Sequence, residues 1–192
     1  MAGRGMMLWP VEAGGDRLDG GSGFDLASYA DAAAGVRADL SSTRLNKGDA
    51  AGDSYAGIEG LEGSAHADQL LGDAAANRLS GGEGNDSLWG RTGNDTLEGG
   101  AGDDILNGGA GADTFVFHAG RDVIHDFEEG LDRIEIRPDL WGGTPPAIED
   151  LLHSDHVLVT ATGLTLVLTP EASLELRGIF DIAVLHDDIF LL

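Results

Sequence analysis

The sequence predicts an all-β fold in which short strands and tight turns alternate and stack in coils. Three observations predict this fold. A nine-residue period runs through the middle of the 192-residue chain, glycines fill the first places of each period, and an apolar residue fills the eighth. Self-similarity at a fixed short period is typical of repeat proteins, whose units bury their apolar side chains by stacking on their neighbours.

The repeats are clearest over residues 81–116, which read GGEGNDSLW, GRTGNDTLE, GGAGDDILN and GGAGADTFV. Upstream, GSAHADQLL (63–71) and GDAAANRLS (72–80) keep the phase with fewer glycines, and looser copies lie at 11–28 and 54–62. Glycines at places one, two and four permit the positive φ angles and close backbone approach of a tight turn. Places one to six therefore predict a turn.

Places seven to nine predict a short strand. Because strand side chains alternate between faces, the apolar residue at place eight points inward and its neighbours point outward. Two repeats make one coil, and successive coils stack at about 4.8 Å, the ordinary spacing of paired strands. The predicted inward residues are Leu70, Leu79, Leu88, Leu97, Leu106 and Phe115.

Acids at the sixth place predict a bound cation. One coil is 18 residues long, so sixth-place residues 18 apart in the sequence lie directly above one another. One edge of the stack therefore carries Asp68, Asp86 and Asp104, and the other carries Asn77, Asp95 and Asp113. Like charges at about 5 Å repel unless a cation lies between them. Calcium suits this role because it takes 6–8 oxygen ligands, whereas magnesium demands stricter geometry and keeps its waters. Alternatively the acids only solubilise a glycine-rich surface, and that alternative stays open for 11–28 and 54–62.

The flanking segments predict more β structure. Residues 29–53 interrupt the repeats with a strand-like VRADL and a loop-like LNKGDAAGD. After Phe115, DVIHDF, DRIEI and the stretch from HVLVT to LELRG predict strands, PDLWGGTPP a turn-rich break and IEDLLH a short helix. We therefore expect three regions: degenerate repeats and a cap over 1–62, the repeat roll over 63–116, and a β-rich cap over 117–192.

Composition excludes several functions. The chain has 34 acidic and 11 basic residues, a net charge of −23, and no cysteine. Such a surface repels phosphate, which argues against nucleic-acid binding. Disulfides and cysteine-ligated zinc are impossible, and no apolar run reaches the roughly 18 residues of a membrane span.

No catalytic motif stands out, so we expect a protein that is not an enzyme. HExxH and GxSxG are absent, and GDSYA at 52–56 lacks the final glycine of the second motif. His153 and His156 are three residues apart, but a single such pair is usually structural. An enzyme with an unfamiliar site remains an alternative.

The motif GGxGxDxUx resembles the RTX (repeats-in-toxin) calcium-binding nonapeptide over residues 63–116. GRDVIHDFEEGLDRIEI (120–136) resembles the sequence that closes the repeats in RTX modules of secreted metalloproteases, lipases and mannuronan epimerases. The resemblance implies a right-handed parallel β-roll with flanking capping strands. It also implies several calcium ions, about four to six, bound between coils.

The resemblance also implies the ligands, because each family turn offers backbone carbonyls and its sixth-place side chain to a cage completed 18 residues on. Sites would link Asp68 to Asp86, Asn77 to Asp95, Asp86 to Asp104, and Asp95 to Asp113. Asn77 replaces an aspartate, and Arg91 and His66 replace glycines. The implied metal residues are Ser64, His66, Asp68, Asp73, Ala75, Asn77, Gly81, Gly82, Gly84, Asp86, Gly90, Arg91, Gly93, Asp95, Gly99, Gly100, Gly102, Asp104, Gly108, Gly109, Gly111 and Asp113, with Asp122 and Asp126 closing the last turn.

By the same resemblance we expect a secreted bacterial protein that uses type I secretion machinery and folds on extracellular calcium. The C-terminal LHDDIFLL is similar to uncleaved type I signals. It also reads as a final strand, and the two interpretations are compatible. Whether the chain is complete or is fused to a catalytic domain stays open, as does its oligomeric state.

A calcium-dependent module for an acidic, alginate-like polysaccharide is the alternative function, because similar modules are attached to mannuronan epimerases. It would need a groove of basic and aromatic residues. The sequence offers few: Trp89, Arg91, Trp141, Arg133 and Arg137.

Overall fold

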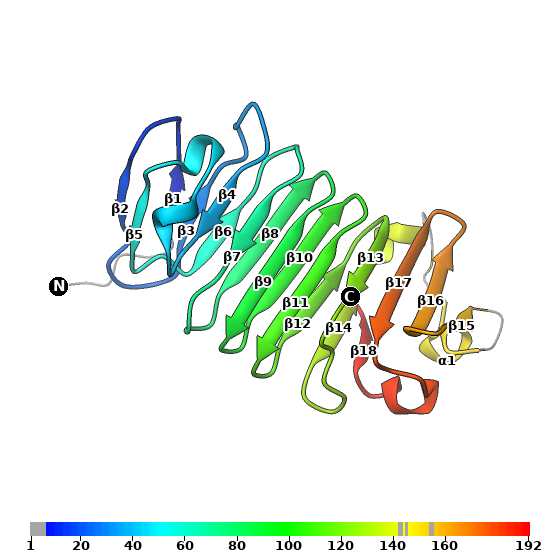
Figure 1. Ribbon diagram of the computed structural model, residues 1–192. Coiled ribbons are helices and arrows are strands. Elements are labelled where there is room, and N and C mark those ends of the chain that lie inside the picture. The colour runs from blue at the N-terminus through cyan, green and yellow to red at the C-terminus, as the bar shows by residue number, and fades with distance from the viewer. Residues whose placement is uncertain (1–6, 142–143, 145, 154–155) are drawn as a thin grey trace.

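Two mostly parallel β-sheets, joined coil by coil through turns, build the molecule in the computed structural model, which describes residues 7–141, 144, 146–153 and 156–192 (Figure 1). The first sheet has eight parallel strands. In spatial order they are β1 (Met7–Pro10), β3 (Asp25–Ser28), β6 (Gly60–Glu62), β8 (Arg78–Glu83), β10 (Thr96–Ala101), β12 (Thr114–Phe117), β14 (Arg133–Ile136) and β18 (Ile189–Leu191).

The second sheet faces the first and takes the intervening strands. In spatial order they are β4 (Arg37–Asp39), β7 (Gln69–Leu71), β9 (Ser87–Thr92), β11 (Ile105–Ala110), β13 (Arg121–Ile124), β17 (Ala172–Arg177), β16 (Gly163–Thr169) and β15 (Val157–Val159). Because the chain alternates between the sheets, the architecture is the predicted parallel β-roll.

The strand register follows the 18-residue coil. Leu97 pairs with Leu79 on one side and Phe115 on the other, and Leu106 pairs with Leu88 in the opposite sheet. These side chains are at most 1 % exposed and stack into the core between the sheets. The strands β8 to β11 are six residues long, because each continues past place nine into the first three places of the next repeat.

The N-terminal end is closed by hydrogen-bonded polar groups. Strands β2 (Arg17–Asp19) and β5 (Ser54–Ala56) form a separate pair. The 3-10 turn η1 (Thr43–Leu45) ends where the expected loop begins, and the loop itself contains a second 3-10 turn, η2 (Gly48–Ala50). Under them, the Tyr29 hydroxyl donates to Asp53 Oδ2 at 2.7 Å, and the Asp16 N–H donates to Asp53 Oδ1 at 2.8 Å. Both oxygens of this buried carboxylate therefore have protein partners.

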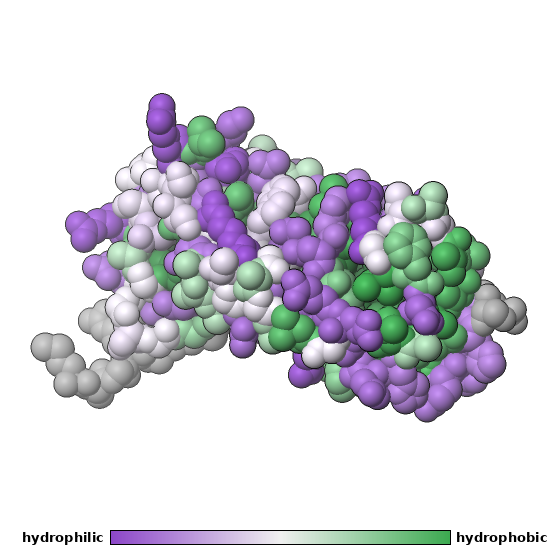
Figure 2. All heavy atoms as spheres, turned by 60° about the horizontal axis from the view of Figure 1, so that its bottom comes forward, coloured by the Kyte–Doolittle hydropathy of each residue, from purple (hydrophilic) through white to green (hydrophobic). Residues whose placement is uncertain are grey.

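At the other end, β15, β16 and β17 form an antiparallel meander that extends the second sheet. The 3-10 turns η3 (Pro138–Trp141) and η4 (Ile182–Leu185), the helix α1 (Ile148–Leu151) and the final strand β18 complete this end. Apolar surface is concentrated here (Figure 2). Within the described part of the chain, no helix has the length and apolar character to cross a membrane. The exposed apolar side chains of this end include Leu158, Val159, Phe180, Phe190 and Leu192.

Truncation of the core stack should destabilise the roll. We expect Leu106→Ala to lower the free energy of unfolding in calcium by about 2–5 kcal/mol, because a fully buried leucine leaves a cavity. Ile105→Ala is the matched control, since its side chain belongs to the same strand but is 41 % exposed. Urea unfolding measures both, and equal losses would contradict the assignment of inward and outward faces.

Candidate calcium sites

Two columns of residues, seven aspartates and one asparagine, run along the edges where turns join the sheets. The first column precedes the second-sheet strands, and the second column precedes the first-sheet strands. The first column is Asp68, Asp86, Asp104 and Asp122, and the second is Asn77, Asp95, Asp113 and Asp132. These residues are only 1–4 % exposed, so their side chains do not serve to solubilise the surface.

Each column is held by one repeated hydrogen bond. The backbone N–H of each member donates to Oδ1 of the next, one coil further on. In the first column the distances are 2.8 Å (Asp68 to Asp86), 2.8 Å (Asp86 to Asp104) and 3.1 Å (Asp104 to Asp122). In the second column the distances are 2.7 Å (Asn77 to Asp95), 2.8 Å (Asp95 to Asp113) and 2.8 Å (Asp113 to Asp132). One oxygen of each carboxylate is thereby satisfied and oriented.

The other oxygen is unpartnered in the middle of both columns and at the C-terminal end of the first. Among the described residues, Oδ2 of Asp86, Asp95, Asp104, Asp113 and Asp122 is buried without a hydrogen-bond partner. A buried carboxylate oxygen without a partner is costly. A cation beside it would remove that cost.

A backbone carbonyl of the next coil lies near the free oxygen of Asp86 and of Asp95. Asp86 Oδ2 and the Gly99 carbonyl oxygen both lie closer than 3.0 Å to the point where a Cβ on Gly81 would stand. Asp95 Oδ2 and the Gly108 carbonyl stand in the same way around Gly90. Any side chain at place one would collide with both oxygens, so glycine there lets a carboxylate oxygen and a carbonyl oxygen come close to each other beside the backbone.

The donors fit calcium. No group of three or more His, Cys, Asp or Glu side chains converges on one point in the residues that the structure covers. A calcium ion held here would therefore take many of its ligands from backbone carbonyls, together with the two carboxylates of stacked turns. An all-oxygen set that mixes carboxylates and carbonyls is what calcium takes.

Burial raises the pKa of the column carboxyls. The pKa of Asp86 rises to about 7 and that of Asp122 to about 8, chiefly by desolvation, with a smaller rise from the charges of neighbouring acids. Desolvation likewise raises the pKa of Asp95 and of Asp104 to about 6. The donated N–H bonds lower these values but do not offset burial. A nearby cation would favour the ionised forms.

At three of the four column ends, a protein N–H donates to a side-chain oxygen of the column residue. Asp68 Oδ2 accepts the Ser64 N–H at 2.6 Å, and Asn77 Oδ1 accepts the Asp73 N–H at 2.7 Å. Asp132 Oδ2 accepts the Glu128 N–H at 2.8 Å. These three end turns therefore fold onto their own column residue, whereas the middle turns and Asp122, at the fourth end, leave one carboxylate oxygen without a hydrogen-bond partner.

The closing segment differs from a simple continuation of the repeats. Asp122 joins the first column, but Asp126 instead accepts the N–H groups of Gly108 at 3.0 Å and Gly109 at 2.7 Å. Asp132 completes the second column, and sequence reasoning missed it because it lies 19 residues after Asp113. A repeat with one inserted residue would have revealed it, since DRIE matches places six to nine.

The other predicted residues lie in the turns of the columns. The His66 N–H donates to the Ser64 hydroxyl, and Asp73 accepts the Ala75 N–H. Arg91 is the one non-glycine residue with positive φ (83°) in the described chain. The predicted glycines stack turn over turn, and they are Gly81, Gly82, Gly84, Gly90, Gly93, Gly99, Gly100, Gly102, Gly108, Gly109 and Gly111.

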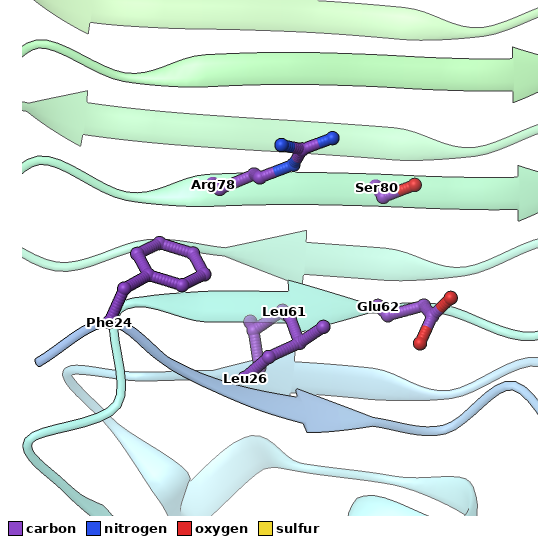
Figure 3. A pocket seen from close by; sticks show the side chains of 6 residues that line it. All are labelled: Phe24, Leu26, Leu61, Glu62, Arg78 and Ser80. Carbon is purple, nitrogen blue, oxygen red and sulfur yellow. The ribbon is translucent and has the colours of Figure 1, made fainter. Parts of the chain in front are cut away.

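The predicted carbohydrate groove does not form as expected. Trp89 and Arg91 line a hollow over the second sheet, whereas Arg133 belongs to a strand of the first, because neighbouring strands of the coil enter opposite sheets. Trp141 packs against the core. A different hollow of about 370 Å³ lies on the first sheet (Figure 3). Its lining residues are Phe24, Leu26, Leu61, Glu62, Arg78 and Ser80.

Stability without calcium should fall as pH rises. A carboxyl whose pKa is raised on folding stabilises the folded chain below its unfolded pKa, and that stability is lost as pH rises through the folded value. The window here runs from 3.8 to about 8. We expect the folded fraction in chelator, measured by far-UV circular dichroism, to be smaller at about pH 8 than at about pH 5. In saturating calcium the order should reverse, because protons compete with calcium; a chelator curve that rises with pH would contradict the account.

The comparisons with known proteins agree with this geometry. The family model for the RTX calcium-binding nonapeptide repeat (4 copies) matches residues 12–27, 62–97 and 89–124. No curated protein matches. The solved AlgE6R3 subunit of the Azotobacter vinelandii mannuronan C5-epimerase is 31 % identical with a TM-score of 0.51, over 65 % of this chain and 78 % of that one.

A second solved structure is the extracellular lipase LipA from Serratia marcescens. It is 21 % identical with a TM-score of 0.48, and the match covers 98 % of this chain but 38 % of the lipase chain. The repeat match, the parallel roll and the similarity to AlgE6R3 lead to one conclusion. This chain belongs to the RTX calcium-binding nonapeptide repeat family.

Proposed function

We propose that this calcium-binding module folds around calcium outside the cell, after export by type I secretion machinery, and so stabilises or delivers a secreted protein. The observation that carries the proposal is the set of five buried Oδ2 atoms without partners. Four gaps between successive coils have an unpartnered Oδ2 on their N-terminal side and a column aspartate on their C-terminal side. They lie between Asp86 and Asp104, Asp104 and Asp122, Asp95 and Asp113, and Asp113 and Asp132.

Calcium in these spaces would supply much of the folding free energy. An ion that binds only the folded chain stabilises it by RT ln(1 + [Ca]/Kd) per site. At a calcium concentration ten times Kd, each ion stabilises the folded chain by about 1.4 kcal/mol, so four ions contribute roughly 5–6 kcal/mol. That equals the whole stability of many small domains, so metal binding and folding would be one event.

Export fits the same balance of energies. With little calcium, the net charge of −23 favours an open chain. Extracellular modules bind calcium at about 10⁻⁴–10⁻³ M, so the coils would close only outside the cell. The C-terminal signal would be read before β18 forms, because in the folded chain Ile189 is buried in the sheet.

Calcium titration of the metal-stripped chain tests the proposal. We expect far-UV circular dichroism to report a cooperative coil-to-β transition near millimolar calcium, and none with magnesium. A chain that is fully folded in chelator would overturn the folding role. Calcium would then be an accessory to a static scaffold.

A matched pair of variants locates the response. Asp104→Asn should lower calcium affinity at least tenfold and reduce the number of bound ions, because Asp104 faces two of the four spaces. Asp103→Asn makes the same chemical change at an exposed neighbour and should leave both nearly unchanged. Isothermal titration calorimetry measures affinity and stoichiometry, and equal effects of the two substitutions would argue against the columns as the binding sites.

We propose binding of a carboxylated polysaccharide as a second candidate function, supported by the 31 % identity to an epimerase subunit and by the hollow of Figure 3. The Phe24 ring offers an apolar face for a sugar. The Arg78 side chain, 55 % exposed and 3.5 Å from Glu98, offers a charge for a carboxylate.

Binding of mannuronan oligomers in calcium tests this candidate. Phe24→Ala and Arg78→Ala should each weaken binding about tenfold, a loss of about 1.4 kcal/mol. Arg121→Ala removes an exposed charge on the second sheet and should have no effect. If the unaltered chain does not bind the oligomers, the candidate is wrong.

A further inference from the structure

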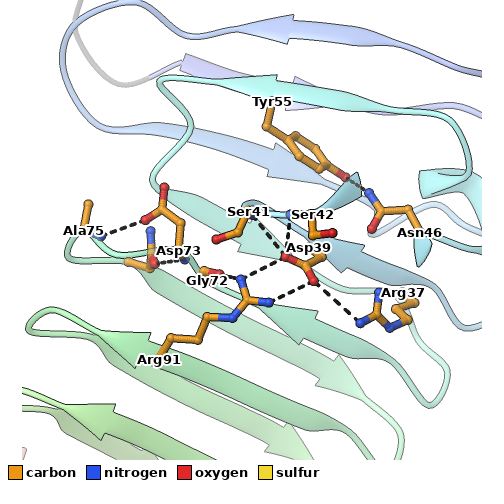
Figure 4. Close-up of polar contacts among 11 residues, drawn as sticks. Arg37, Asp39, Ser41, Ser42, Asn46, Tyr55, Gly72, Asp73, Ala75 and Arg91 are labelled. Carbon is orange, nitrogen blue, oxygen red and sulfur yellow. Dashed lines mark hydrogen bonds and ion pairs between the residues drawn. The ribbon is translucent and has the colours of Figure 1, made fainter. Parts of the chain in front are cut away.

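The N-terminal end of the second column contains a cation that belongs to the protein itself. The guanidinium of Arg91 binds both oxygens of Asp39, with Nη1–Oδ1 and Nη2–Oδ2 distances of 2.9 Å (Figure 4). Nη1 also donates to the carbonyl oxygen of Gly72. Arg91 thus spans two coils, from β9 past β7 to β4.

The Gly72 carbonyl has equivalents in the next turns. Gly72, Gly90 and Gly108 all occupy place one. The Gly108 carbonyl meets Asp95 Oδ2 in the space beside Gly90, and the Gly90 carbonyl meets Asn77 Oδ1 in the space beside Gly72. Place-one carbonyls therefore face the preceding turn, where they share a space with an acidic or amide oxygen.

The same stacking continues below Gly72. The N–H of Leu40 bonds to the Leu71 carbonyl as the N–H of Gly72 bonds to that of Trp89, so Leu40 begins the preceding turn. In the space between these two turns, the Gly72 carbonyl and a carboxylate, that of Asp39, meet a guanidinium. A carbonyl and a carboxylate are also the groups that meet between the turns of the proposed calcium sites. Here, however, the cation between them is a side chain of the protein.

Backbone geometry explains how Arg91 reaches this place. In the equivalent turn, a Cβ on Gly82 would point at the Ser64 carbonyl of the preceding coil. A side chain at place two is therefore directed back along the stack. Positive φ is unfavourable for arginine, and such conformations persist where their surroundings demand them.

Asp39 is fully neutralised by protein groups. It is 2 % exposed and accepts the N–H groups of Ser41 at 3.1 Å and Ser42 at 2.9 Å. Arg37 lies 3.6 Å from its Oδ2. A planar guanidinium that grips both carboxylate oxygens is the strongest side-chain pairing available to an acid.

We propose that Arg91 takes the place of a calcium ion at the N-terminal end of the second column. The inference rests on the proposed calcium function of the columns. Residues 36–73 then hold together without calcium and form the template on which the calcium-dependent coils stack. Asp53 and Asp68 lie in this same segment, and the oxygens of both carboxylates already accept hydrogen bonds from protein groups, so neither carboxylate needs a metal.

Hydrogen exchange followed by mass spectrometry tests this inference on the full chain. In chelator we expect peptides from 36–42 and 69–73 to be protected and peptides from 95–116 to exchange freely. Arg91→Ala should lose at least tenfold protection in the first two segments. Arg78→Ala removes the same charge from the outer face of the first sheet and should not.

Calcium rescue separates an ion substitute from an ordinary ion pair. In Arg91→Gly, which has the glycine of the repeat, added calcium should restore protection of 36–42 and 69–73, because carbonyl and carboxylate remain. Arg91→Lys keeps the charge without the planar fork, so its protection in chelator should be intermediate.

Three results would overturn the inference: free exchange of 36–73 in the unaltered chain in chelator, equal behaviour of Arg91→Ala and Arg78→Ala, or no rescue of Arg91→Gly by calcium. Failure of the proposed function has a different signature, because peptides from 95–116 of the unaltered chain would then not respond to calcium.

Discussion

Neutralisation of buried carboxylates is the constraint on which this structure depends. Stacking strands at the spacing of a sheet forces the place-six acids into columns, and their neighbours bury them almost completely. One oxygen of each acid is satisfied by the backbone of the preceding coil. The other is costly to bury without a partner, so a cation or a protein donor beside it stabilises the closed roll.

The chain solves this problem differently along its length. Asp53 in the N-terminal cap uses a tyrosine hydroxyl and a backbone N–H, and Asp68 uses Ser64. Between Asp86 and Asp122 no such donor exists. Under the proposed function, the N-terminal coils would hold together without metal, and the coils from Asp86 to Asp122 would gain their stability from calcium.

Much of the fold could be predicted from periodicity, because the apolar residue at place eight and the 18-residue coil determine the register of pairs such as Leu79 with Leu97. Asp132 was missed because a one-residue insertion breaks the count. The contact of Arg91 with Asp39 joins residues 52 positions apart. No local pattern indicates it, since it depends on how an interrupted coil stacks beneath a regular one.

Anomalous diffraction from crystals grown in calcium would locate the bound ions. We expect four strong peaks, one between each of the pairs Asp86–Asp104, Asp104–Asp122, Asp95–Asp113 and Asp113–Asp132, and no peak beside Asp39, where the Arg91 guanidinium lies. Columns that remain without peaks in saturating calcium, with their Oδ2 atoms bound to backbone donors, would contradict this expectation.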